Sequence, residues 1–166
     1  STIFRPVNRN DKDTSGLVLA ARNSYAAPLL AQGVEKLYYA IVEGELPLGP
    51  GVIDAPIARL PLPSLLRQVS PEGKPSVTEF EVLHRDGQIC KLALCPVTGR
   101  THQLRVHCAY MGFPILGDPQ YGTEESRRFS SELGLTYQML CAHRLEFTHP
   151  LNGESMVLES RMDVGV

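Results

Sequence analysis

The stretch SVTEFEVLHRDGQICKLALCPV, residues 76–97, carries the clearest structural signal in the sequence. Its apolar residues fit one strand over 77–82 and a returning strand over 89–94, as in a β-hairpin. Asp86-Gly87 lies between the two strands, and this pair favours a tight turn. The segment therefore predicts antiparallel β-structure in the middle of the chain.

Further strands are predicted on both sides of this hairpin, in short runs rich in apolar, β-branched or aromatic residues. They cover residues 17–21, 36–44, 139–148 and 156–160. A short helix is expected over 25–32, whereas residues 45–75 are rich in Pro and Gly and are expected to form a long loop or a small subdomain. The fold class predicted from this order is α+β, with a mixed, mostly antiparallel β-sheet and a few flanking helices.

Composition indicates an ordinary globular domain. The chain has 166 residues, of which 43% are hydrophobic and 20% charged, and no apolar run approaches the ~20 residues of a membrane helix. The four cysteines form no CxxC pair and predict buried thiols in a reducing compartment, hence a cytoplasmic protein. Because the chain begins at Ser1 without a methionine, it is expected to be a piece of a longer protein.

The charged residues give a mixed indication about nucleic acid. The formal net charge of −2 does not mark an RNA-binding protein. However, only four of the 16 basic residues are lysines, and the others are arginines. Guanidinium groups suit phosphate, carboxylate and stacking contacts better than ammonium groups do. Net charge alone therefore argues only weakly against an RNA partner.

The segment TGRTHQLRVHCAYMG, residues 98–112, predicts a second helix. Thr101 can act as its N-cap, and Gly112 follows its end near Met111. Residues three or four positions apart share one face of a helix, so this helix has an apolar face. The residues expected to line that face toward the core are Leu104, Cys108 and Met111.

Polar side chains gather around the first turn of this helix. Arg100 lies at its entrance, and His102 and Arg105 share one face. A surface helix with solvated side chains is the ordinary interpretation, but three polar groups around one turn beside an apolar stripe favour a functional site. The HxxxxH spacing of His102 and His107 is not that of a zinc site, so no metal is predicted.

A second polar group lies near the start of the chain, in RPVNRNDKDTSGLVLAARN, residues 5–23. Asp11, taken alone, is more often a turn residue than a catalyst. It can also be read as half of a carboxylate pair with Asp13, suited to hydrolytic acid–base chemistry. Neither interpretation is decided by this segment alone.

Two further polar positions have structural interpretations of their own. Tyr38 and Tyr39 are adjacent on one predicted strand, so one of them faces a cleft or the core and the other faces the opposite side. Asp118 lies between Gly117 and Pro119, which together mark a rigid turn. On composition alone, this turn is a structural loop.

The stretches NRNDKDTSGLVLAA, KLYYAIVEG and TGRTHQLRVH…GFPILGDPQYG, followed by LCAHRLEFTHP, together resemble the RluA-type pseudouridine synthases over nearly the whole chain. Enzymes of that family isomerise specific uridines in ribosomal or transfer RNA to pseudouridine. The resemblance implies one catalytic domain over residues 1–166, an RNA partner, no membrane association and no cofactor or metal. It also implies that the chain lacks a further N-terminal segment and an S4-type RNA-binding domain.

The resemblance implies three catalytic residues. Asp11 matches the catalytic aspartate of the family, Tyr38 its tyrosine, and Arg105 the arginine that pairs with the aspartate. A guanidinium beside a carboxylate favours its ionised form, and an aromatic ring offers a stacking platform to a base extracted from the RNA. Arg9 matches a residue that fills the gap left by that base. The residues implied to contact RNA are Arg9, Arg100, His102 and Gln103.

Two departures from the family pattern keep alternatives open. Asn8 stands where the family has His, and Asn10 stands where it has Leu. A non-catalytic RNA-binding module on the same fold, inactivated by substitution or truncation, is therefore the alternative to an enzyme. A hydrolase using Asp11 and Asp13 is a weaker alternative, because it gives Tyr38 no task.

Because the net charge is low, an RNA-binding surface needs a local excess of positive charge. The expected cluster surrounds Asp11 and draws on Arg9, Arg100 and Arg105. The choice between a covalent and a glycal mechanism, the target uridine and the oligomeric state stay open.

Overall fold

The predicted hairpin lies inside the sheet that organises the fold. In the computed structural model it consists of β8 (Val77–Asp86) and β9 (Ile89–Pro96), paired antiparallel. Asp86 pairs directly with Ile89, so the two turn residues begin at Gly87, one position later than predicted. Gly87 has a φ of 62°, a left-handed conformation that a residue without a Cβ adopts without strain.

The structure describes residues 5–6, 15–16, 20–21, 35–148 and 154–159. Several predictions therefore lie outside the described residues. They are the helix over 25–32, the first part of the strand over 17–21, and the polar segment 8–13 that contains Arg9 and Asp11.

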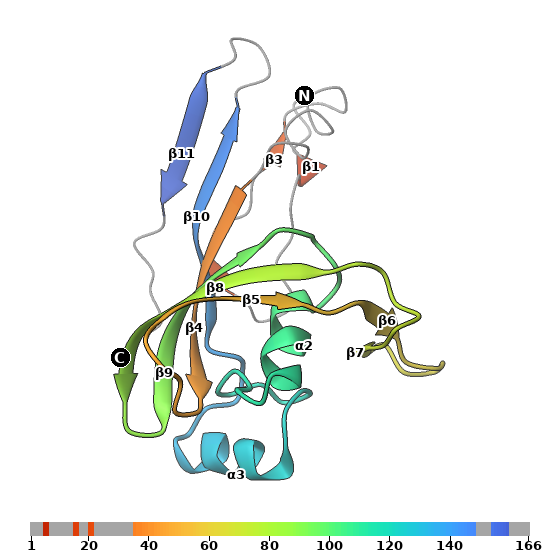
Figure 1. Ribbon diagram of the computed structural model, residues 1–166, viewed down its shortest axis with the longest axis vertical. Helices are drawn as coiled ribbons and strands as arrows, with labels where there is room; N and C mark the ends of the chain where they lie inside the picture. The colour runs from red at the N-terminus through yellow and green to blue at the C-terminus, as the bar shows by residue number, and fades with distance from the viewer. Residues whose placement is uncertain (1–4, 7–14, 17–19, 22–34, 149–153, 160–166) are drawn as a thin grey trace.

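The main sheet has seven strands, in the order β11-β10-β4-β9-β8-β5, with β2 beside β10 (Figure 1). Among the described strand pairs, β2 and β10 are the parallel one, and the others are antiparallel. This sheet, together with the two helices in the described part of the chain, confirms the predicted α+β class. The bounds of the remaining strands are β2 (Ser15–Gly16), β4 (Glu35–Glu43), β5 (Gly49–Asp54), β10 (Leu140–Thr148) and β11 (Ser155–Glu159).

Residues 45–75 contain an edge strand as well as a small subdomain. Strand β5 pairs with β8 and has the sequence GPGVID. Because Gly and Pro have low strand propensity, this strand was not predicted. An edge strand tolerates Pro because one side of its backbone needs no ladder hydrogen bond. Strands β6 (Ile57–Arg59) and β7 (Arg67–Val69) follow as a separate antiparallel pair that protrudes beyond the end of β5 (Figure 1, right). A further short pair joins β1 (Arg5–Pro6) to β3 (Ala20–Ala21).

Helix α2 (Gln103–Tyr110) begins later than predicted. Its N-cap is His102 rather than Thr101, with a φ of 57° and no capping hydrogen bond from the His102 side chain. The predicted burial of its Leu and Cys residues is confirmed, but Met111 is 45% exposed. Met111 is the C-cap residue, where the chain leaves the helical path, and the prediction that it lines the core was wrong.

Helix α3 (Glu124–Glu132) is an element that sequence reasoning missed. Its first turn is closed by a reciprocal capping box, in which Thr123 Oγ1 accepts the N–H of Ser126 and Ser126 Oγ accepts the N–H of Thr123. Glu or Gln is the usual partner in this motif, so Ser126 made the signal weak. Phe129 of α3 packs on a core cluster that contains Leu116.

The largest core cluster joins the sheet to α2. Tyr38, Ala40 and Val42 alternate on one face of β4 and belong to the same buried cluster as Leu104 and Cys108 of α2. Helix α2 is therefore attached to the face of the sheet that carries Tyr38. None of the helices in the described part of the chain has the length and apolar character needed to cross a membrane.

Candidate active site

The register of the sheet brings the chain that follows Asp11 next to Tyr38. Ala142 of β10 pairs with Tyr38 of β4 on one side and with Gly16 of β2 on the other. Neighbouring strands lie about 4.8 Å apart, which places Gly16 about 10 Å from Tyr38 across the sheet. Ser15 is four residues after Asp11, and four residues span at most about 14 Å. The described residues Ser15 and Gly16 thus join the sheet close to the row of Tyr38.

The two adjacent tyrosines of β4 face opposite sides of the sheet, as predicted. Tyr38 is 6% exposed and packs in the core beside α2. Tyr39 lies against the ring of His143, with 4.5 Å between the ring centroids, and the Nζ of Lys91 lies 4.8 Å from its ring centre. Of the two, Tyr38 is thus the one on the side of α2 and Arg105.

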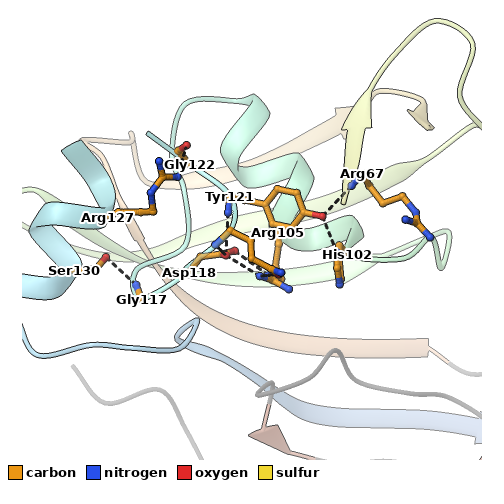
Figure 2. Close-up of polar contacts among 10 residues, drawn as sticks. Arg67, His102, Arg105, Gly117, Asp118, Tyr121, Gly122, Arg127 and Ser130 are labelled. Carbon is orange, nitrogen blue, oxygen red and sulfur yellow. Dashed lines mark hydrogen bonds and ion pairs between the residues drawn. The ribbon is translucent and has the colours of Figure 1, made fainter. Parts of the chain in front are cut away.

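Arg105 is buried, so a helix with solvated arginine is excluded. Its side chain is 3% exposed and forms a bidentate ion pair with Asp118 (Figure 2). Nε donates to Oδ2 at 2.9 Å and Nη2 donates to Oδ1 at 2.8 Å. Nη2 also donates to Oε1 of Gln120 at 2.8 Å. Two parallel charged hydrogen bonds fix the orientation of the guanidinium plane.

Asp118, interpreted from composition as part of a structural loop, is a polar centre of the site. Besides binding Arg105, its Oδ1 accepts the backbone N–H groups of Gln120 at 2.9 Å and Tyr121 at 3.1 Å. The preceding residue is also held, because the N–H of Gly117 donates to Ser130 Oγ of α3 at 2.9 Å. One carboxylate therefore organises its own loop and the arginine of the neighbouring helix. The sequence indicated a turn at Asp118 and Pro119. It did not indicate the ion pair, because the partner of Asp118 lies 13 residues away along the chain.

Tyr121 joins the polar groups of the helix to the β6–β7 pair. Its hydroxyl lies 2.6 Å from Nδ1 of His102 and accepts the backbone N–H of Arg67 at 3.0 Å (Figure 2). The guanidinium carbon of Arg105 lies 4.9 Å from its ring centre. His102 and Arg105, predicted to share one helix face, therefore both contact Tyr121. Burial raises the pKa of the Tyr121 phenol, so the hydroxyl keeps the proton that it can donate to His102.

Gln103 is buried, and its side-chain amide has partners for both donors and both acceptor positions. It donates to the carbonyl of Val77 and to Thr78 Oγ1, both at 2.9 Å, and accepts from Thr98 Oγ1 and the N–H of Arg100. These four hydrogen bonds tie the helix entrance to β8. This geometry favours a positioning role for Gln103 over the RNA contact that the resemblance implied.

His107 also has an internal role. Its Nδ1 lies 2.8 Å from Thr78 Oγ1 and its Nε2 lies 2.9 Å from the carbonyl oxygen of Ala55. Burial lowers the pKa of His107, so the imidazole is neutral, with its proton on Nε2 facing the carbonyl. Among the residues that the structure describes, no three His, Cys, Asp or Glu side chains cluster as a metal ion requires.

Replacing Gly117 by Ala is expected to lower the free energy of unfolding by at least about 1 kcal/mol more than replacing Gly134 by Ala. Both glycines have left-handed backbones, with φ of 81° and 75°, so both variants lose a similar amount to backbone strain. A Cβ on Gly117 would collide with the carbonyl oxygen of Tyr137, whereas a Cβ on Gly134 meets no atom within 4 Å. Urea denaturation of both variants measures the difference, and equal losses would contradict a tightly packed Asp118 loop.

Comparison with known proteins adds independent findings. The family described as RNA pseudouridylate synthase matches residues 1–110. The ribosomal large subunit pseudouridine synthase C of Escherichia coli (strain K12) is 41% identical over 169 residues, which cover 96% of this chain and 53% of that protein. The Vibrio parahaemolyticus protein of the same name is 38% identical over 162 residues, covering 95% and 51%.

A solved structure has the same fold. Human RNA Pseudouridylate Synthase Domain Containing 1 superposes with a TM-score of 0.81 and 30% identity, over 96% of this chain and 69% of that chain. The chain spans about half the length of the curated relatives that it matches. These comparisons agree with the resemblance carried by the sequence motifs.

Proposed function

Because the chain belongs to the RNA pseudouridylate synthase family, we propose that this protein isomerises specific uridines in RNA to pseudouridine. Ribosomal RNA is the favoured substrate, since the relatives named above are ribosomal large subunit pseudouridine synthases. Transfer RNA is the second substrate class. The proposed location is the cytoplasm, as the pattern of the four cysteines in the sequence predicts.

The observation that carries the proposal is the row formed by Gly16, Ala142 and Tyr38. It attaches Gly16, which follows Asp11 in the chain, to the sheet in the row of Tyr38, and Tyr38 lies on the face of the sheet that carries α2. This register supports the proposal that Asp11, Tyr38 and Arg105, far apart in the sequence, act on one nucleotide. A hydrolase that used Asp11 and Asp13 would give Tyr38 and Arg105 no task in its reaction.

The proposed reaction needs no external reagent. The bond between uracil N1 and ribose C1′ breaks, the base rotates, and a bond forms between C5 and C1′. The proton on C5 is lost and N1 regains a proton, so the product is an isomer of the substrate. The nucleotide must leave the RNA stack before this happens, at a cost of a few kcal/mol.

Each residue has a physical task in this proposal. Asp11 supplies an ionised carboxylate at the sugar–base junction, and Arg105 stabilises that charge. Asp118 keeps the Arg105 guanidinium in one orientation, so little reorganisation accompanies the reaction. Tyr38 offers an aromatic ring to the extracted base, and its hydroxyl is a candidate to assist removal of the C5 proton.

Pseudouridine mapping of total RNA from a strain lacking the gene tests the proposal. We expect one or more uridines of ribosomal RNA to lose the modification and to regain it when the full-length gene is restored. Loss confined to transfer RNA would reassign the substrate class. An unchanged pseudouridine map would overturn the proposed function. RNA binding without tritium release from RNA labelled at uridine C5 would instead favour the non-catalytic module.

A further inference from the structure

A basic groove lies beside the candidate active site, between the β6–β7 pair and the loop that enters α2. Its volume is about 640 Å³, enough for a nucleotide-sized group. Four of its lining side chains are cationic and one is a carboxylate, an excess of three positive charges. These residues are Arg59, Arg67, Lys74, Arg100 and Glu72. Of the four cations, Arg100 is the one that the sequence motifs indicate.

The arrangement of the two β-strand arginines costs stability unless an anion is present. Arg59 and Arg67 are directly opposite each other in the β6–β7 register. Like charges at such positions repel, because directly opposite Cβ atoms lie about 5 Å apart. In the part of the chain that the structure describes, neither arginine forms a salt bridge. A bound anion would remove this repulsion.

The other contacts of these cations orient them without neutralising them. Arg67 Nη1 donates to the carbonyl oxygen of Leu65 at 2.6 Å, and Arg100 Nε donates to that of Pro75 at 3.0 Å. Both acceptors are uncharged, so the positive charge stays available to a ligand. Arginine is suited to such a site because its planar group can bind two phosphate oxygens at once.

Both walls of the groove are connected to the polar network at α2. The backbone N–H of Arg67 donates to the hydroxyl of Tyr121, which contacts His102 and Arg105. On the opposite wall, the backbone N–H of Arg100 donates to Oε1 of Gln103 at 3.0 Å. The groove is thus connected by hydrogen bonds to the candidate active site and is not a separate surface feature.

We propose that this groove binds the phosphate backbone of the RNA next to the target uridine, with Arg59, Arg67, Lys74 and Arg100 as its phosphate ligands. This inference rests on the proposed function and extends it to the substrate-binding surface. Phosphate contacts carry no sequence information but fix the position of the RNA. The groove therefore holds the strand while the target base is extracted.

The test uses the double variant Arg59→Gln/Lys74→Gln of the full-length protein and unmodified large-subunit ribosomal RNA transcribed in vitro. Both side chains are exposed, and neither makes a hydrogen bond through its charged group in the described part of the chain. Arg127→Gln/Arg128→Gln is the matched control, since it removes the same charge from exposed positions on α3. Thermal melting of both variants verifies that they are folded.

The expected result is a loss of RNA affinity of at least about tenfold at 0.1 M salt for the groove variant, and a change of less than about threefold for the control. The slope of log K against log salt concentration should fall in magnitude by about 1.4, since each lost phosphate contact removes about 0.7 on single-stranded RNA. Equal affinities and slopes for the two variants would overturn the groove proposal.

Tritium release from RNA labelled at uridine C5 separates this proposal from the proposed function. If the wild-type protein releases tritium and the groove variant binds RNA as the control does, the groove proposal fails and the enzyme assignment stands. If the wild type releases no tritium and the groove variant still binds RNA more weakly than the wild type, the groove proposal stands and the proposed reaction fails.

Discussion

Replacing Asp11 by Asn is expected to lower the rate of pseudouridine formation by at least about 10³-fold. The amide has the size of the carboxyl group but cannot carry its negative charge or take up a proton as a base. RNA affinity should change little, because the phosphate contacts lie elsewhere. Tritium release from RNA labelled at uridine C5, measured under single-turnover conditions at saturating RNA, gives the rate directly.

Asp13→Asn is the matched control for this experiment. It makes the same chemical change two residues away in the same polar segment, and it should leave the rate within a few-fold of the wild type. Equal losses in the two variants would favour a carboxylate pair and contradict the assignment of Asp11 alone. Full activity of the Asp11 variant would remove Asp11 from the reaction altogether.

Replacing Asp118 by Asn is expected to lower the free energy of unfolding by about 3–5 kcal/mol. The side chains of Arg105 and Asp118 are 3% and 1% exposed, so the guanidinium would lose the charge of its bidentate partner at a buried position. The amide also puts an NH2 donor where one of the two carboxylate oxygens accepts a hydrogen bond from Arg105. Urea denaturation followed by circular dichroism measures the loss.

Glu159→Gln supplies the control for the buried pair. Glu159 Oε1 lies 3.6 Å from Nε of Arg144, and its side chain is 60% exposed. Removing one partner of such a surface pair should change the free energy of unfolding by less than about 1 kcal/mol. If Asp118→Asn proved as mild as this control, the bidentate pair could not be the interaction that holds Arg105 in place.

The elements that sequence reasoning predicted well are those whose stability is local or repetitive. Strands β4, β8, β9, β10 and β11 follow runs of apolar, β-branched or aromatic residues that need a sheet to bury them. Strand β5 escaped prediction because its Pro and Gly residues are tolerated only at a sheet edge. Helix α3 escaped because its capping box uses Ser126 in place of a long polar side chain.

For the candidate site, the sequence indicated the residues but not their contacts. Motif order pointed to Asp11, Tyr38 and Arg105, and periodicity placed His102 and Arg105 on one face of α2. Burial could not be inferred from periodicity, because a charged residue is buried only when a partner is close by. That partner, Asp118, belongs to a loop whose sequence alone indicated only a turn.

The fold class, the central hairpin, the family resemblance and the residue types available for catalysis could all be read from the amino-acid sequence. These depend on local patterns and on the order of motifs along the chain. The three-dimensional contacts were needed to show that Asp118 holds Arg105, that Tyr121 links α2 to β7, and that two arginines oppose each other in the groove. Such contacts join residues 8 to 54 positions apart. They arise from strand register and loop closure, which no pattern within one segment encodes.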